Sequence, residues 1–473
     1  MKKFGFILMC FVAGLMSCTK TEYITITPEE ETPDTSTYTI MMYGCGGGNL
    51  DSSMVLNIQE ALLAGASDRV NFVGQIKFSK AYQETEALKG TQRFIVGEAG
   101  AQWYEPVEVL DTYLKLNDPA NITAFINWAK EQRPADNYIL LLWNHGGGWH
   151  PVMDPATRAV IFDDVINPYI GMSLNELVKG IKDSNTKFKM VYYDACLMGM
   201  FENIAGLSDC TDYTMCASHI TPGLGGDYNS LIHHLENSTN FEKAMEDYIN
   251  ETVEHWEQQG MALDLMLVNN GQMEPLLAEI KVLSGYLKNV AEIAANFDIE
   301  TDSNDIQKYY LCSAFQTAIC SCYHYDYNYY NDGRAAYPYY DLNHFLQILV
   351  NSRTHEYSAK FVDIASRISR ALKNVIVYKD VTAPIEFVDL SIAITIVDKA
   401  MWDMDFYEEE YYDLAFQQKT GWGDWLKINP ITPIGNPDPL TVLGITLPEY
   451  GGESSEPSKE QMIEYILSLI GKN

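Results

Sequence analysis

A histidine and a cysteine in this sequence each follow an apolar, strand-like run, and together they could perform thiol chemistry. His145 follows the run Tyr138–Trp143 and begins a loop with three glycines, and Cys196 comes shortly after the run Phe188–Tyr193. A neighbouring imidazole can take the proton of a thiol and favours the thiolate, which is the reactive nucleophile. The same imidazole can later protonate a leaving amine. The pair therefore predicts covalent catalysis by a cysteine.

The two strand-like runs are the elements that must position this pair. Functional groups of parallel sheets gather at the carboxyl ends of neighbouring strands, so two such strands would bring His145 and Cys196 together. Asp194 lies two residues before Cys196, and the period of two in a strand places both on one face. A carboxylate there could form the base of a pocket that selects Arg or Lys through a charge-assisted hydrogen bond. Alternatively, Asp194 only orients the loop.

At Asn144–Trp149 and Asp194–Met198 the chain resembles the clostripain family of cysteine peptidases, relatives of caspases, legumains and gingipains. Weaker similarities occur at Tyr38–Asp51, Ala217–Gly223 and Thr420–Trp425. The histidine and cysteine are 51 residues apart, which fits the separation of about 50 residues in caspases. The resemblance implies an α/β fold, a caspase-like three-layer sandwich with a mostly parallel central sheet between helices. It also implies a His–Cys dyad without a third member.

The resemblance assigns further roles around this dyad. The backbone N–H groups of Gly146 and Cys196 would form the oxyanion hole, and Thr221 would be a polar wall of the pocket above Asp194. Family members often mature by cutting their own chain after a basic residue between the histidine and the cysteine. Arg158 is the candidate for this autoprocessing site, although an ordinary surface arginine is the alternative.

No cofactor is required for this chemistry. Asp163 and Asp164 could contribute to a calcium site, which some relatives use, but two adjacent carboxylates are too few to specify one. The chain has nine cysteines, of which Cys10 and Cys18 belong to the N-terminal segment. The others show no spacing typical of a zinc site or a disulfide framework, and no pairing follows from the sequence.

The N-terminus predicts export and lipid anchoring. After two lysines, the apolar run Phe4–Leu15 is too short to cross a membrane and is typical of a secretory signal. Leu15–Cys18 resembles a bacterial lipobox, in which Cys18 would become the lipidated first residue; a plain signal peptide is the alternative. Residues 19–37 are rich in Thr, Glu and Pro and predict a flexible tether. We therefore expect the protein in the cell envelope, held to a membrane by its N-terminal lipid.

Composition and periodicity predict two globular parts. Strand-like and helix-like stretches alternate over residues 38–270, which predicts the catalytic domain and includes a capping box at Ser173 and Glu176. Residues 271–473 predict a mainly helical C-terminal domain, with long amphipathic helices at 272–295 and 356–372. The net charge of −32 argues against binding to nucleic acid. It favours basic peptide or protein substrates, or serves only for solubility.

The sequence thus predicts an exported, lipid-anchored cysteine endopeptidase that cleaves after Arg or Lys. One alternative is a thiol hydrolase or transpeptidase with another specificity. Another is a non-catalytic, surface-binding lipoprotein that retains the fold. The presence of both His145 and Cys196 argues against this last alternative, because degenerate sites usually lose one of the pair.

Overall fold

The computed structural model describes ten stretches of the chain. These are residues 37–149, 160–167, 171–238, 240–302, 305–322, 339–351, 355–382, 395–397, 408–431 and 458–471. The predicted signal, most of the tether, Cys18 and Arg158 lie outside the described residues. Within the described stretches, no helix combines the length and apolar character that a membrane crossing needs.

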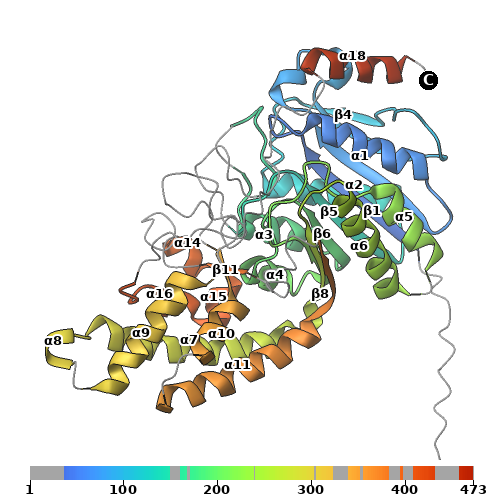
Figure 1. Cartoon of the computed structure of the whole chain (residues 1–473). Coiled ribbons are helices and arrows are strands. Elements are labelled where there is room, and N and C mark those ends of the chain that lie inside the picture. Colours follow the sequence, from blue (N-terminus) through green and yellow to red (C-terminus); the bar gives the residue numbers. More distant parts are fainter. Residues whose placement is uncertain are drawn as a thin grey trace, which may run out of the picture.

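Among the described residues, nine strands form one central sheet in the order β10-β8-β7-β6-β5-β1-β2-β3-β4, which lies at the centre of the view in Figure 1. The central strands β7, β6, β5, β1 and β2 run parallel, while β3, β4, β8 and β10 pair antiparallel at the two edges. Central parallel strands are buried on both faces, which explains near-continuous apolar sequences such as that of β5. The bounds are β1 (Tyr38–Cys45), β2 (Val70–Lys77), β3 (Thr91–Ile95), β4 (Glu108–Leu110), β5 (Asn137–Trp143), β6 (Phe188–Asp194), β7 (Thr211–Cys216), β8 (Asp264–Asn269) and β10 (Ile376–Val381).

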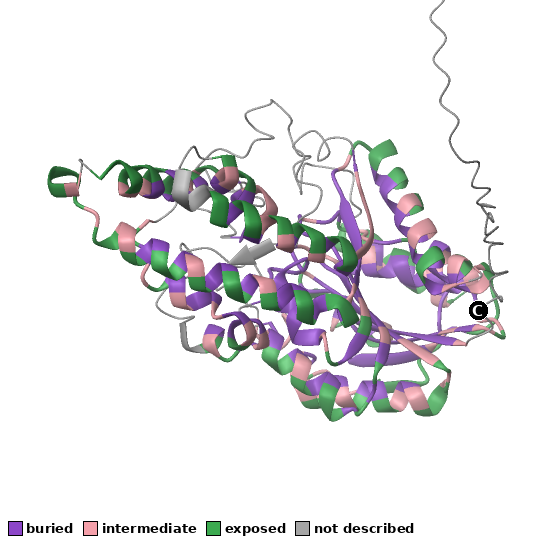
Figure 2. Ribbon diagram, turned by 90° about the horizontal axis from the view of Figure 1, so that it is seen from below, coloured by how far each residue is buried: buried purple, intermediate pink, exposed green. Residues whose placement is uncertain are grey.

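Helices cover both faces of this sheet, as the predicted three-layer sandwich requires. The alternation of β1 shows the two faces: Met41 and Tyr43 enter one hydrophobic core, whereas Ile40 and Met42 enter the other. Helices α2 (Pro119–Gln132), α3 (Leu174–Asp183) and α4 (Phe201–Leu207) pack on the first face, and α1 (Asp51–Ala64), α5 (Tyr228–Asn237) and α6 (Phe241–Gln258) pack on the second. The helices are buried toward the sheet and exposed on their outer sides (Figure 2). The predicted capping box at Ser173 and Glu176 is present at the start of α3.

Beyond residue 270, the described residues are mainly helical but are tied to the sheet. Its longer helices, which Figure 1 shows grouped on one side, are α7 (Met273–Ala295), α9 (Ile306–Ser321), α10 (Leu342–Asn351) and α11 (His355–Val375). Shorter helices are α8 (Ile299–Asp302), α14 (Glu408–Tyr412), α15 (Ala415–Thr420) and α16 (Trp422–Leu426), and β9 (Tyr339–Asp341) pairs with β11 (Thr395–Val397) in a small sheet. Strand β10 completes the main sheet, and α18 (Lys459–Ile470) packs beside α1. The boundary at residue 270 stays a prediction.

Candidate active site

The register of two parallel strands brings His145 and Cys196 to the same edge of the sheet. Strands β5 and β6 are neighbours, and Trp143 lies opposite Asp194. His145 and Cys196 each follow two residues later, at the carboxyl ends where functional groups of parallel sheets gather. The two loops touch, since a Cβ added to Gly146 would lie 2.1 Å from the carbonyl oxygen of Cys196 and 2.8 Å from its nitrogen. The structure therefore brings together the two residues that the sequence singled out.

The thiol of Cys196 is half-buried and faces the loop between β7 and α5. The backbone N–H of Thr221 donates to Sγ at 3.3 Å, and Oγ1 of Thr221 lies 3.5 Å from Sγ. The next residue, Leu197, has a φ of 61°, in the left-handed region that a leucine rarely adopts. Its N–H donates to the carbonyl of His219 at 3.0 Å, which fixes this sharp turn. Thr221, predicted as a pocket wall, thus contacts the thiol itself.

His145 has a hydrogen-bond partner that the sequence analysis missed. Its Nε2 lies 2.7 Å from Oδ1 of Asn49, a residue in the glycine-rich loop between β1 and α1. The neighbouring Asn144 donates from Nδ2 to the carbonyl of Cys45 at 2.6 Å, and its Oδ1 accepts from the N–H of Phe162 at 2.7 Å. The loop after β5 is therefore tied to the loop after β1. Because β1 neighbours β5, a polar residue just after β1 was the signal that could have identified Asn49.

Asp194 is buried at the end of β6. Its Oδ2 accepts from the hydroxyl of Tyr228 at 2.6 Å and from the N–H of Gly226 at 3.1 Å. Burial raises the pKa of Asp194 to about 6, although these hydrogen bonds act in the opposite direction. Strand β6 ends at Asp194, so strand alternation does not extend to Cys196. The loop between β7 and α5 connects the two residues instead, because it contacts Cys196 through Thr221 and Asp194 through Gly226.

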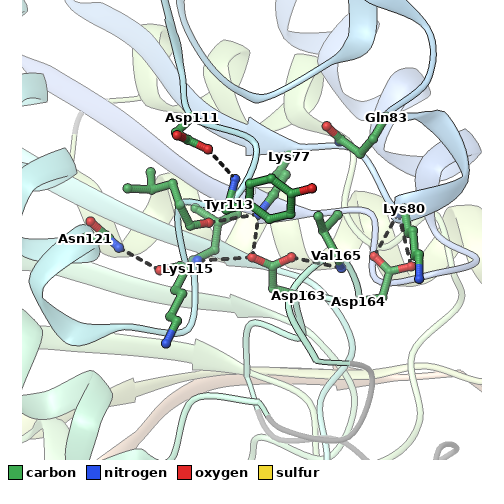
Figure 3. Close-up of polar contacts among 12 residues, drawn as sticks. Lys77, Lys80, Gln83, Asp111, Tyr113, Lys115, Asn121, Asp163, Asp164 and Val165 are labelled. Carbon is green, nitrogen blue, oxygen red and sulfur yellow. Dashed lines mark hydrogen bonds and ion pairs between the residues drawn. The ribbon is translucent and has the colours of Figure 1, made fainter.

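The two carboxylates considered for calcium are committed to protein contacts (Figure 3). Asp163 forms a fully buried ion pair with Lys77 at 2.9 Å and accepts from the N–H of Leu116 at 3.2 Å. Asp164 accepts from the backbone N–H of Lys80 at 3.1 Å. Within the described part of the chain, no three His, Cys, Asp or Glu residues are grouped so that they could hold a metal ion.

Several cysteines differ from Cys196 because they are buried. Among the described residues no two cysteines are joined by a disulfide. Cys45, Cys210 and Cys216 are buried, and burial raises the pKa of each thiol above its ordinary value, which disfavours a reactive thiolate. Cys196 is partly exposed, and its backbone contacts the loop of His145 at Gly146.

Comparison with known proteins gives the family. The chain matches the clostripain family over residues 96–428. Clostripain from Hathewaya histolytica is 24% identical over 379 residues, which cover 72% of this chain and 70% of that protein. An inactive zymogen C11 protease from Parabacteroides distasonis has a TM-score of 0.57 at 15% identity, covering 82% of this chain and 99% of that one. A secreted C11 cysteine protease from Bacteroides thetaiotaomicron, solved with an irreversible peptide inhibitor, has a TM-score of 0.53, the same identity and the same coverage. The predicted sandwich fold is thereby confirmed, and the chain belongs to the clostripain family and is a cysteine endopeptidase.

Proposed function

We propose that this endopeptidase is exported and lipid-anchored, and that it cleaves after Arg or Lys with His145 as general base and Cys196 as nucleophile. The observation that carries the catalytic part of the proposal is the parallel register of β5 and β6, with both residues two positions beyond the pair Trp143 and Asp194. The two loops leave neighbouring strand ends and touch at Gly146, which is the arrangement that a general base and its nucleophile need.

In the proposed reaction, His145 takes the proton from Sγ of Cys196, and the thiolate attacks the scissile carbonyl carbon. The N–H of Thr221 donates to Sγ, and a hydrogen bond to the charged form of a thiol favours that form. The N–H groups of Gly146 and Cys196 would hold the oxyanion, and loss of one such donor typically costs roughly 3 kcal/mol of transition-state stabilisation. The imidazolium then protonates the leaving amine, and water hydrolyses the thioester.

Asp194 would supply the preference for basic residues. Both hydrogen bonds from Tyr228 and Gly226 go to Oδ2, so the described part of the chain leaves Oδ1 without a donor. A Cβ at Gly225 would lie 2.3 Å from Oδ1, so the glycine keeps this oxygen clear of a side chain. An arginine or lysine of a substrate could then donate to Oδ1 through a charge-assisted bond.

We further propose that the enzyme cuts its own chain after Arg158. We also propose that lipid on Cys18 anchors it to a membrane in the cell envelope. Arg158 lies outside the described residues, between Trp149 and Val160, which are both buried. A cut there would separate β5 from β6 in the chain. The two pieces would stay together because five residues of β5 pair with five of β6.

Fluorogenic peptides ending in Arg, Lys, Asp and a neutral residue test this proposal. Wild-type enzyme should cleave the basic peptides, and Cys196→Ala and His145→Ala should each lose turnover by a similar large factor, because a dyad acts as a unit. Cys312→Ala, at another partly exposed cysteine, is the matched control and should keep full activity. Asp194→Asn should lose turnover of basic peptides selectively.

The alternatives give different outcomes in the same assay. Turnover that depends on Cys196 but is faster on the Asp or the neutral peptide would show that the pocket at Asp194 does not select basic residues and that the enzyme has another specificity. If Cys196→Ala keeps its turnover in a preparation free of contaminating proteases, Cys196 is not the nucleophile.

A further inference from the structure

Asn49 lies in the segment Tyr38–Asp51, and neither the assigned site residues nor the dyad chemistry requires it. Its Oδ1 lies 2.7 Å from Nε2 of His145. We propose that Asn49 is a positioning residue that holds the His145 imidazole for proton transfer with Cys196. This inference rests on the proposed function, because it matters only if His145 is the base.

The hydrogen bond determines which ring nitrogen can act. An amide oxygen can only accept, so Nε2 of His145 carries the proton that it donates to Asn49. In a neutral imidazole the other nitrogen is then unprotonated, so Nδ1 is the base that receives the proton of Cys196. The contact therefore selects one tautomer and restricts rotation of the ring. A Cys-His-Asn arrangement performs this task on unrelated protease folds.

The glycines before Asn49 allow its loop to approach the histidine. Gly47 and Gly48 have φ values of 56° and 98°, in a region where residues with a Cβ are strained. A Cβ on Gly47 would lie 3.2 Å from Cδ2 of His145 and 2.9 Å from Nδ2 of Asn144. Larger residues here would push the loop away and carry the amide of Asn49 with it.

The loop that carries Asn49 is anchored on both sides. Before it, the N–H of Gly46 donates to the carbonyl of Lys77 at 2.9 Å. After it, Oδ1 of the buried Asp51 accepts from the N–H of Ser79 at 2.8 Å. Asn49 itself is exposed. An exposed side chain on an anchored loop contributes little to core packing, so its removal should affect the site and leave the fold intact.

The predicted effect is on turnover. Asn49 contacts His145 and has no part in the proposed pocket at Asp194, so Asn49→Ala should lower kcat and leave KM near its wild-type value. Displacement of a catalytic group by about 1 Å costs on the order of 100-fold, so we expect kcat to fall roughly 10- to 100-fold. Asn49→Asp retains an acceptor for Nε2–H and adds a negative charge. The added charge should raise the pKa of His145 and move the alkaline limb of the kcat/KM profile to higher pH.

The experiment compares full-length wild type, Asn49→Ala, Asn49→Asp and the control Asn237→Ala. Asn237 is an exposed asparagine at the end of α5 whose Nδ2 lies 3.2 Å from Nδ1 of His233, so it is a matched asparagine–histidine contact outside the site. The readouts are kcat and KM on an Arg-ended peptide, the pH profile, and thermal melting. A fourth readout is the pH dependence of iodoacetamide labelling at Cys196, followed by mass spectrometry. We expect the control to match wild type and Asn49→Asp to recover part of the turnover lost in Asn49→Ala.

Two outcomes would overturn the inference. One is wild-type kcat in Asn49→Ala while His145→Ala and Cys196→Ala are inactive, which leaves the proposed function standing. The other is a pH profile of Asn49→Asp identical to that of wild type. If Asn49→Ala lowers the melting temperature, Asn49→Asp decides the question, because its side chain has nearly the same size. Activity that persists in His145→Ala would instead refute the proposed function.

Discussion

Replacement of Gly146 by alanine should disable catalysis, because the added methyl group would clash with the backbone of Cys196. The added Cβ would lie 2.1 Å from the carbonyl oxygen of Cys196, whereas ordinary contacts begin at 3.4 Å. Gly146 is not among the residues with positive φ, so alanine can adopt its backbone conformation. The loops of His145 and Cys196 must therefore separate by roughly 1 Å, and a displacement of this size costs on the order of 100-fold in turnover. Overpacking of this kind also lowers stability by about 1–3 kcal/mol.

The assay is kcat/KM on an Arg-ended peptide, together with urea unfolding of the same samples. Gly97→Ala is the matched control, because a Cβ at Gly97 meets nothing within 4 Å. The control should keep wild-type turnover, and Gly146→Ala should lose far more activity than its change in unfolding free energy can explain. If Gly146→Ala stays within a few-fold of wild type, the two loops do not touch as described, and the arrangement of the oxyanion hole must be abandoned.

Four further predictions follow from other parts of the molecule. Because burial raises the pKa of Asp194 to about 6, this carboxyl is neutral below that pH and charged above it. The preference for Arg over neutral peptides should therefore rise as the pH increases through about 6, and an equal preference at pH values below and above 6 would show that Asp194 does not select the substrate. Lys77→Met leaves the buried Asp163 unpaired and should lower the free energy of unfolding by about 3–5 kcal/mol in urea, and a loss under about 1 kcal/mol would indicate a solvated pair. Purified active enzyme should separate into two fragments cut after Arg158 under denaturing conditions, with Arg158→Ala uncut there; a fully active single chain would contradict this. Wild-type protein expressed in a bacterial host should fractionate with membranes, and Cys18→Ser should be released or left unprocessed; soluble mature wild type would exclude the anchor.

Much of the fold could be predicted because its elements have strong local signals. The apolar runs that became β5 and β6 end at the polar residues Asn144 and Asp194, so their carboxyl ends, and hence the positions of His145 and Cys196, were evident. The capping box at Ser173 and Glu176 is a contact within one turn and needs no tertiary partner. Family motifs at the same strand ends supported the same assignment.

Contacts between distant segments could not be read from these local signals. Asp163 was considered as a calcium ligand, but Lys77, 86 residues earlier in the chain, pairs with it in the core. A buried charge needs a partner, and the partner depends on which strands become neighbours. In the same way, β10 pairs with β8 although more than 100 residues separate them. Nothing in the periodicity of either strand specifies that pairing.

The sequence by itself determined the alternation of strands and helices, the family and the two residues expected to act as base and nucleophile. Only the tertiary structure decided that Asn49 contacts His145, that Thr221 contacts Sγ of Cys196 and that Gly225 borders Asp194. The physical reason is that secondary structure follows from interactions within a few residues, whereas a site forms where loops from several strands converge. That convergence depends on strand order and register, which the whole core selects at once.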